Sequence, residues 1–348
     1  MCNMAGYAGN RQAAPILLEM LRRQEPYDGD MCTGVATIFE GKLYYRKANV
    51  DVDTFIRETD VLSLPGTVGI AHTRPSRNPD VPPLHPFISS DKRTALANNG
   101  TGPLTKYTPQ YSVFARMLED EGKVFASESK VPGKKTSSLL SNGHSVLPGE
   151  VRVLLAEKYM NEGKSPEDAF AQACADMYGD HVNIALTENR PDSIFAVRIS
   201  RPMTAVSEMG ESYIATTRFG LPEELRDQAF DLPVLKTCVI NKNGVTVTGS
   251  TVGVEPVADM SPFTYHEGYR RIEALLRSER APLYFDEIET EVNGMRDLWE
   301  GDRTFVQHAR LVYDLLYQFD KEGRLEREMR VQERPNGTRR RWYFKLND

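Results

Sequence analysis

The sequence lacks an apolar run long enough to cross a bilayer, and its first residues lack the charged segment and hydrophobic stretch of a signal peptide. We therefore expect no membrane span and a cytoplasmic protein. It also lacks a strong excess of charge, because the net charge is only -6 over 348 residues, so its overall balance favours neither nucleic acid nor an anionic membrane. With 40% hydrophobic residues, the chain can form one large domain and a smaller one.

Cysteine is scarce, and the four cysteines form no C-x-x-C pair, so we expect no metal site, no disulfide framework and no cofactor. Cys2 stands out only by its position. Removal of Met1, which a small second residue permits, would leave a free α-amine beside the thiol. An α-amine with a pKa of about 7.7–8.0 can act as a general base, and a thiol is a reactive nucleophile. On position alone, however, an ordinary small residue near a chain end is the favoured interpretation.

The hydrophobic pattern predicts an α+β layered domain. A strand over residues 2–8 is followed by an amphipathic helix over 13–23, in which Ile16, Leu17, Met20 and Leu21 share one face. Further strands, then helices, then strands again follow, and 131–149 has no period, which indicates a long surface loop. The predicted segments after the first helix are strands near 35–39, 43–46, 68–73 and 94–98, helices near 109–121, 150–161 and 165–178, and strands near 182–187, 194–199, 213–217, 235–240 and 245–248.

A second domain is predicted after the strand pattern stops, with a first domain over residues 1–255 and a second over 262–348. The pattern of the second region predicts three helices followed by two strands, with alternating residues on either side of Pro335-Asn336-Gly337. Asn-Gly is a strong hairpin signal because both residues tolerate a positive φ. Three helices followed by a hairpin resemble a winged helix-turn-helix module.

Several segments follow Cys2 in an order that is typical of a known family. They are Gly6, the helix with Leu21-Arg22-Arg23, then Ala71-His72-Thr73-Arg74, and then Ala97-Asn98-Asn99-Gly100. This order and spacing resemble the class II glutamine amidotransferases, and most closely the glutaminase domain of glucosamine-6-phosphate synthase, over about residues 2–250. The resemblance implies a four-layer αββα sandwich of the N-terminal-nucleophile hydrolase type. The pattern of the second region adds a small winged-helix-like domain after it.

The resemblance also implies roles for particular residues. Cys2 would attack a glutamine amide, the Asn99 side chain and the Gly100 backbone N–H would donate to the oxyanion, and Arg74 with the adjacent Thr73 would bind the substrate and its α-carboxylate. In isolation, Asn99-Gly100 would be an ordinary turn and Arg74 could equally form a structural salt bridge.

Two departures from the family concern the substrate pocket. The family continues from the arginine into a tryptophan-containing stretch, whereas this chain has Pro75-Ser76-Arg77-Asn78-Pro79. The family also binds the α-ammonium with an aspartate after Ser-Glu-Thr, whereas the corresponding run here ends in Lys130, which would repel an ammonium. Glu128 and Glu150 are the candidate replacements, although either could be only a surface charge.

The residues after the predicted boundary are too few for the two isomerase domains of that synthase, so we expect ammonia to pass to a partner protein or to be released. Two alternatives stay open: a degenerate domain that senses a ligand and signals through the winged helix, and a hydrolase of another amide. Arg339-Arg340-Arg341 would form a basic wing, but acidic and basic residues nearly balance over 263–348, so DNA binding is left open and not favoured. A homodimer is also left open.

Overall fold

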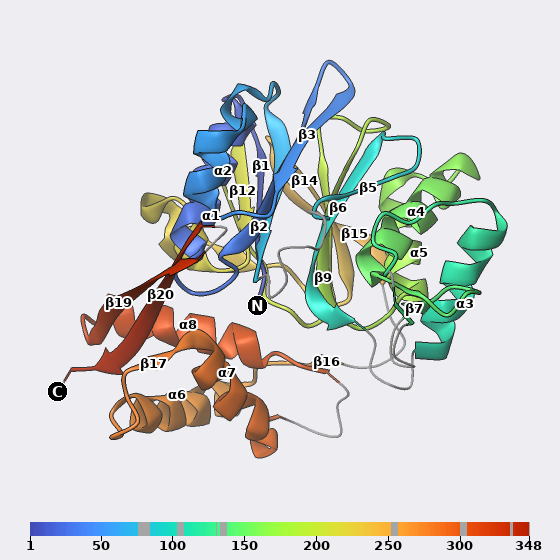
Figure 1. Cartoon of the computed structure of the whole chain (residues 1–348). Coiled ribbons are helices and arrows are strands. Elements are labelled where there is room, and N and C mark those ends of the chain that lie inside the picture. Colours follow the sequence, from blue (N-terminus) through green and yellow to red (C-terminus); the bar gives the residue numbers. More distant parts are fainter. Residues whose placement is uncertain are drawn as a thin grey trace.

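The computed structural model describes residues 1–75, 84–102, 108–129, 131–132, 138–251, 257–299, 305–334 and 337–347. Two sheets face each other at the centre, and helices cover the outer face of each sheet (Figure 1). These are the four layers that the sequence predicts. In the described part of the chain, no helix combines the length and the apolar character that a membrane crossing requires.

Both sheets are antiparallel throughout. The first has seven strands, in the order β13 (Phe230–Asp231), β11 (Thr204–Glu208), β12 (Glu211–Ala215), β1 (Asn3–Ala8), β4 (Val68–Arg74), β2 (Met31–Phe39) and β3 (Lys42–Ala48). The second has six strands, in the order β15 (Gly244–Thr251), β14 (Lys236–Asn241), β10 (Ile194–Arg198), β9 (Asp180–Thr187), β6 (Thr94–Gly102) and β5 (Phe87–Ile88).

Five helices form the two outer layers. The first sheet carries α1 (Ala13–Gln24) and α2 (Val52–Glu58), and the second carries α3 (Thr108–Asp120), α4 (Pro148–Asn161) and α5 (Pro166–Asp176). The stretch 131–149, predicted as one long loop, contains a short ladder between β7 (Ser138–Leu139) and β8 (Ser145–Val146) and the start of α4. The loop prediction was therefore wrong for the described part of this stretch.

Strand β1 shows why the layers stack in this way. Its side chains alternate between the two faces of the sheet. Ala5 and Tyr7 pack in the cluster that includes α1, while Met4 and Ala8 pack in the cluster between the two sheets. Because both faces of β1 are buried, its start is held firmly, and Cys2 directly precedes that start.

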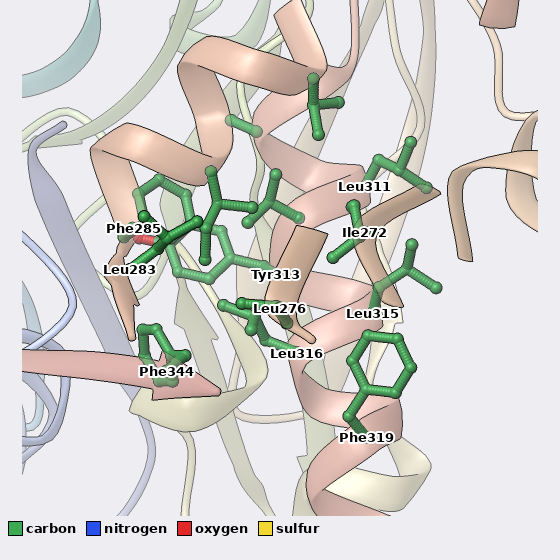
Figure 2. Packing of buried hydrophobic residues seen from close by; sticks show 14 of the residues in the cluster. Ile272, Leu276, Leu283, Phe285, Leu311, Tyr313, Leu315, Leu316, Phe319 and Phe344 are labelled. Carbon is green, nitrogen blue, oxygen red and sulfur yellow. The ribbon is translucent and has the colours of Figure 1, made fainter. Parts of the chain in front are cut away.

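The C-terminal region packs against one end of the sandwich (Figure 1). Its three-stranded sheet has the order β17-β20-β19. Figure 2 shows part of the core of this region. Tyr27 and Phe219 from the sandwich belong to the same core. The winged-helix interpretation and its boundary stay predictions, and Pro335 and Asn336 of the predicted turn lie outside the described residues. The elements are β16 (Val257–Ala258), α6 (Pro262–Leu276), β17 (Leu283–Tyr284), α7 (Phe285–Gly294), β18 (Phe305–Val306), α8 (His308–Lys321), β19 (Leu325–Arg334) and β20 (Gly337–Leu346).

The arginine run on β20 faces the sandwich. Arg339 pairs with Asp30 at 3.0 Å, Arg340 pairs with Asp53 at 3.0 Å, and Arg341 is buried. Carboxylates of the sandwich thus already neutralise arginine charges that were predicted to be available to phosphates. DNA binding by this run stays a prediction that was not favoured.

Candidate active site

Three strand ends bring the predicted catalytic residues together. Cys2 precedes β1, and Arg74 ends β4, which pairs antiparallel with β1, so the start of one strand lies beside the end of the other. Asn99 and Gly100 come from β6 of the second sheet. Cys2, Arg74 and Gly100 line one cavity, so the site lies where the two sheets meet at one edge of the sandwich.

Asn99 holds Cys2 on both sides of its backbone. The side-chain oxygen of Asn99 accepts from the Cys2 nitrogen at 3.4 Å, and its side-chain nitrogen donates to the Cys2 carbonyl at 3.0 Å. Gly100 has a φ of +147°, and a side chain there would collide with the backbone of Asp180 and His181. Glycine is therefore required for β6 to pack this closely against β9 at the point where it reaches the Cys2 site.

A cavity of about 180 Å³, here called the Arg74 cavity, opens beside Cys2. Arg74 lines it, and the Nε of Arg74 is buried without a hydrogen-bond partner. An unsatisfied guanidinium N–H in a cavity is a natural donor for a substrate carboxylate. The position of Arg74 therefore fits the role that the resemblance implies.

Burial sets the protonation of the groups around Cys2. Burial raises the pKa of the Cys2 thiol above its ordinary value, although the N-terminal ammonium, Arg74 and Arg201 oppose that rise. Burial also lowers the pKa of His72 to about 3, with a further contribution from Arg74. His85, whose ring stacks on His72 at 3.9 Å, has its pKa lowered well below the usual range by burial. Both imidazoles are therefore neutral at pH 7.

Three predicted substrate residues are not brought to the cavity. Thr73 is fully buried, and its hydroxyl accepts from the Asn3 side chain at 3.2 Å. Glu150 accepts from the backbone N–H groups of Ala126 and Ser127 at 2.7 and 2.8 Å, so it anchors a loop.

Glu128 lies on the surface, where its carboxylate bonds to Asn142 at 2.9 Å and His144 at 2.8 Å. Like Thr73 and Glu150, it does not line the Arg74 cavity. The proposed replacement of the family aspartate by Glu128 or Glu150 is therefore not what the structure has. Lys130 and residues 76–79, on which the two departures rest, lie outside the described residues.

Arg152 also lines the Arg74 cavity, although no motif in the sequence predicted it. Arg152 lies in the first turns of α4 and is fully buried, and all nine residues 149–157 are buried. A lone arginine within the otherwise apolar run Val151–Ala156 was the signal that could have found it, because a buried charge needs a partner or a function.

A second cavity of about 400 Å³, here called the C-terminal cavity, lies on the other side of the nucleophile. Cys2, Asn99 and Gly100 line it from the sandwich, while Glu289 of α7 and His308 of α8 line it from the C-terminal region. The predicted nucleophile therefore has a cavity on each side, and the C-terminal region encloses one of them.

A chain of charged groups lines the C-terminal cavity. Arg201 contacts Asp180 at 2.6 Å and Glu289 at 2.9 Å, and His308 Nε2 lies 3.1 Å from Glu289. Burial alone would raise the pKa of Glu289, but His308 and Arg201 outweigh it and hold that pKa at about 2. The carboxylate is thus ionised at neutral pH and links α7 to Arg201, which follows β10.

Met1 is present and lies in this same region. Its ammonium contacts the Asp28 carboxylate and lies 3.7 Å from Asp286. In this form the α-amine belongs to Met1, so the amine that the proposed chemistry needs is absent until Met1 is removed.

Comparison with solved structures gives the class of fold. Glutamine phosphoribosylpyrophosphate amidotransferase from B. subtilis, complexed with ADP and GMP, superposes with a TM-score of 0.58 and 16% identity, covering 80% of this chain and 59% of that one. The allosteric regulatory enzyme of purine biosynthesis superposes with a TM-score of 0.57. The fold is therefore that of the N-terminal-nucleophile glutamine amidotransferases, as the sequence predicts. No family model matches the sequence.

Comparison with curated proteins identifies relatives by their sequence. The glutamine–fructose-6-phosphate aminotransferase of Pyrococcus horikoshii is 24% identical over 323 residues, which are 92% of this chain and 48% of that protein. The protein of the same name from Methanothermobacter thermautotrophicus is 31% identical over 206 residues, covering 59% of this chain and 30% of its own length. The chain thus spans less than half of either relative. Both relatives are enzymes, and the resemblance to glutamine amidotransferases is confirmed.

Proposed function

We propose that this chain, after loss of Met1, hydrolyses a side-chain carboxamide of glutamine or a close relative through a Cys2 thioester and releases ammonia. The observation that carries the proposal is the meeting of Cys2, Arg74 and Gly100 around one cavity, with the Asn99 side chain bonded to the Cys2 backbone. It supplies a nucleophile, a cation for a carboxylate and donors next to the attacked carbonyl.

The proposed reaction uses the new α-amine of Cys2 as its base. The raised pKa of the Cys2 thiol keeps the sulfur protonated at neutral pH, so the amine takes the thiol proton as Sγ attacks the amide carbon. The C–N bond then breaks, and the nitrogen accepts that proton and leaves as ammonia. Water adds to the thioester, the C–S bond breaks, and the acid product and the thiol are released.

The oxyanion donors of the proposal are the Asn99 side chain and the Gly100 N–H. Asn99 Nδ2 donates to the Cys2 carbonyl at 3.0 Å, so this donor already lies next to the nucleophile. A donor held in place before reaction stabilises developing charge without reorganisation.

The C-terminal cavity is the proposed route for ammonia. It joins Cys2 to α7 and α8, so an acceptor would bind there or on a partner protein docked over it. A homodimer stays a prediction. All four cysteines are unpaired, which is typical of a reducing compartment, and we assign the reaction to the cytoplasm.

A regulatory role is the second proposal, and the contacts between α7, α8 and the Cys2 site favour it. Glu289 and His308 lie across the C-terminal cavity from Cys2, so a ligand bound at Cys2 would alter contacts with the predicted winged-helix region. In this proposal the fold binds an amide without turnover, and binding changes the stability of the C-terminal region.

The test is turnover by purified protein whose intact mass shows loss of Met1. Glutamate and ammonia are followed together from glutamine, and related carboxamides are assayed in parallel. Cys2→Ala should abolish turnover, whereas Cys238→Ala, which removes a buried thiol of β14, should retain it. Turnover that survives Cys2→Ala would overturn the proposal, and amide binding without turnover by the processed protein would favour the regulatory one.

A further inference from the structure

Arg152 is a fully buried cation without a carboxylate partner among the described residues. Its Nη2 donates to the Tyr111 hydroxyl at 3.0 Å and to the Met177 carbonyl at 2.8 Å. Its Nε and Nη1 are buried and have no hydrogen-bond partner. Leaving two N–H groups of a buried cation unpaired is costly, because the guanidinium has lost its water and gained nothing in return.

The other two buried arginines of the described chain are better satisfied than Arg152. All three nitrogens of Arg198 donate, to the Arg201 and Leu232 carbonyls and to Gln307. Arg341 forms ion pairs with two aspartates. Arg341 leaves only its Nε unpaired, whereas Arg152 leaves two nitrogens unpaired and has no carboxylate partner among the described residues. The unpaired nitrogens of Arg152 therefore need an explanation that folding alone does not supply.

Arg152 lines the Arg74 cavity together with Cys2 and with Pro148 and Gly149 from the start of α4. The cavity thus has two guanidinium groups and the N-terminus of a 14-residue helix, whose dipole also favours negative charge. The described residues that line it include no carboxylate.

The two carboxylates proposed for this pocket bind other partners and do not neutralise the guanidinium groups. Both oxygens of Glu150 accept from backbone N–H groups, and Glu128 bonds to Asn142 and His144 on the surface. A ligand ammonium in the Arg74 cavity would therefore meet guanidinium groups without a described carboxylate to bind it.

We infer that the preferred substrate is a carboxamide whose carboxylate binds Arg74 and which presents an oxygen acceptor, neutral or anionic, to Arg152 where glutamine has its ammonium. The inference rests on the proposed Cys2 chemistry and names its substrate class. Bond making and breaking are unchanged: the C–N bond of the amide breaks, ammonia leaves and water restores Cys2. The substrate differs from glutamine only in the group that replaces the ammonium next to the carboxylate.

Three amides of equal chain length test the inference with Met1-free protein. They are glutamine, glutaramate with hydrogen in place of the ammonium, and 2-hydroxyglutaramate with a hydroxyl there. We expect kcat/KM to rise in that order, with 2-hydroxyglutaramate favoured over glutamine by about tenfold or more, because a buried donor left unpaired discriminates strongly. Arg152→Met should remove most of that preference.

The preference is a ratio within one preparation, so it does not depend on the fraction of a variant that folds. Arg198→Lys is the matched control, because it alters a buried arginine that does not line the cavity, and it should keep the wild-type ratio. Glutamine preferred by the wild type, or a ratio unchanged in Arg152→Met, would overturn the inference and leave the Cys2 reaction standing. If no carboxamide were turned over, the proposed function would fail first.

Discussion

The guanidinium of Arg341 lies 3.1 Å from the carboxylate of Asp28 and 3.0 Å from that of Asp30. This buried contact joins the C-terminal hairpin to the loop before β2, and Asp28 also contacts the Met1 ammonium. The C-terminal region is therefore tied to the segment on which the nucleophile lies.

Replacing Arg341 by Met should lower the free energy of unfolding by about 3 kcal/mol, because it removes the buried cation that Asp28 and Asp30 share and leaves Asp30 with Arg339 and Asp28 with the Met1 ammonium. Denaturant unfolding would measure the change. Arg270→Met is the control, since Arg270 is exposed and pairs with Glu267 on the surface of α6, and it should change stability by about 0.5 kcal/mol or less. Equal stabilities of the two variants would contradict the structural role of Arg341.

Replacing Asn99 by Ala should lower kcat by about 10²–10³ with a much smaller change in KM, because an oxyanion donor acts in the transition state. Asn99 also bonds to the Cys2 backbone, so thermal unfolding should be measured beside the kinetics. A rise in KM with unchanged kcat would instead mean that Asn99 only binds the substrate.

The rate should depend on pH through the α-amine of Cys2. Burial raises the pKa of the thiol, so the thiol cannot supply its own thiolate at neutral pH, and the amine must be unprotonated to take the proton. We therefore expect kcat/KM to fall as pH drops through the α-amine pKa of about 7.7–8.0. A variant with an N-terminal extension that retains Met1 lacks this amine and should show negligible turnover. A flat profile over this range would refute the assignment of the base.

Much of the fold could be predicted because its signals are local. The alternation of β1 and the shared face of Leu17 and Leu21 in α1 each follow from the period of one element. Cys2, Arg74 and Asn99 could be predicted from the order of their segments. Their meeting needs the antiparallel pairing of β1 with β4 and the stacking of two sheets, which the resemblance implies.

The rest of the site depends on packing that no local pattern encodes. Glu150 and Arg152 are two residues apart in α4, yet one anchors a loop and the other lines the cavity. Helical geometry turns them through about 200° relative to each other, so the direction of α4 decides which of them reaches the substrate. Sequence alone does not fix that direction, so it could not show that Arg152 and not Glu150 lines the cavity.

Replacing Glu150 by Gln tests this reassignment. We expect a loss of about 1–3 kcal/mol in unfolding free energy, because one of the two backbone N–H groups that Glu150 binds loses its acceptor. The preference among the three amides should stay as in the wild type. If the KM for glutamine alone rose severalfold, Glu150 would bind the ammonium after all.

Lys47 should make stability depend on pH in the alkaline range. Burial lowers its pKa from 10.5 to about 8, so between these values the unfolded chain holds a proton that the folded chain lacks, and stability rises with pH across that window. Across this pH range the free energy of unfolding should rise by about 3 kcal/mol. The Lys47→Met chain lacks this group, so its unfolding free energy relative to the wild type should fall by about that amount as pH increases. The exposed Lys164→Met is the matched control, and parallel curves for Lys47→Met and the wild type would show that the ammonium is not desolvated.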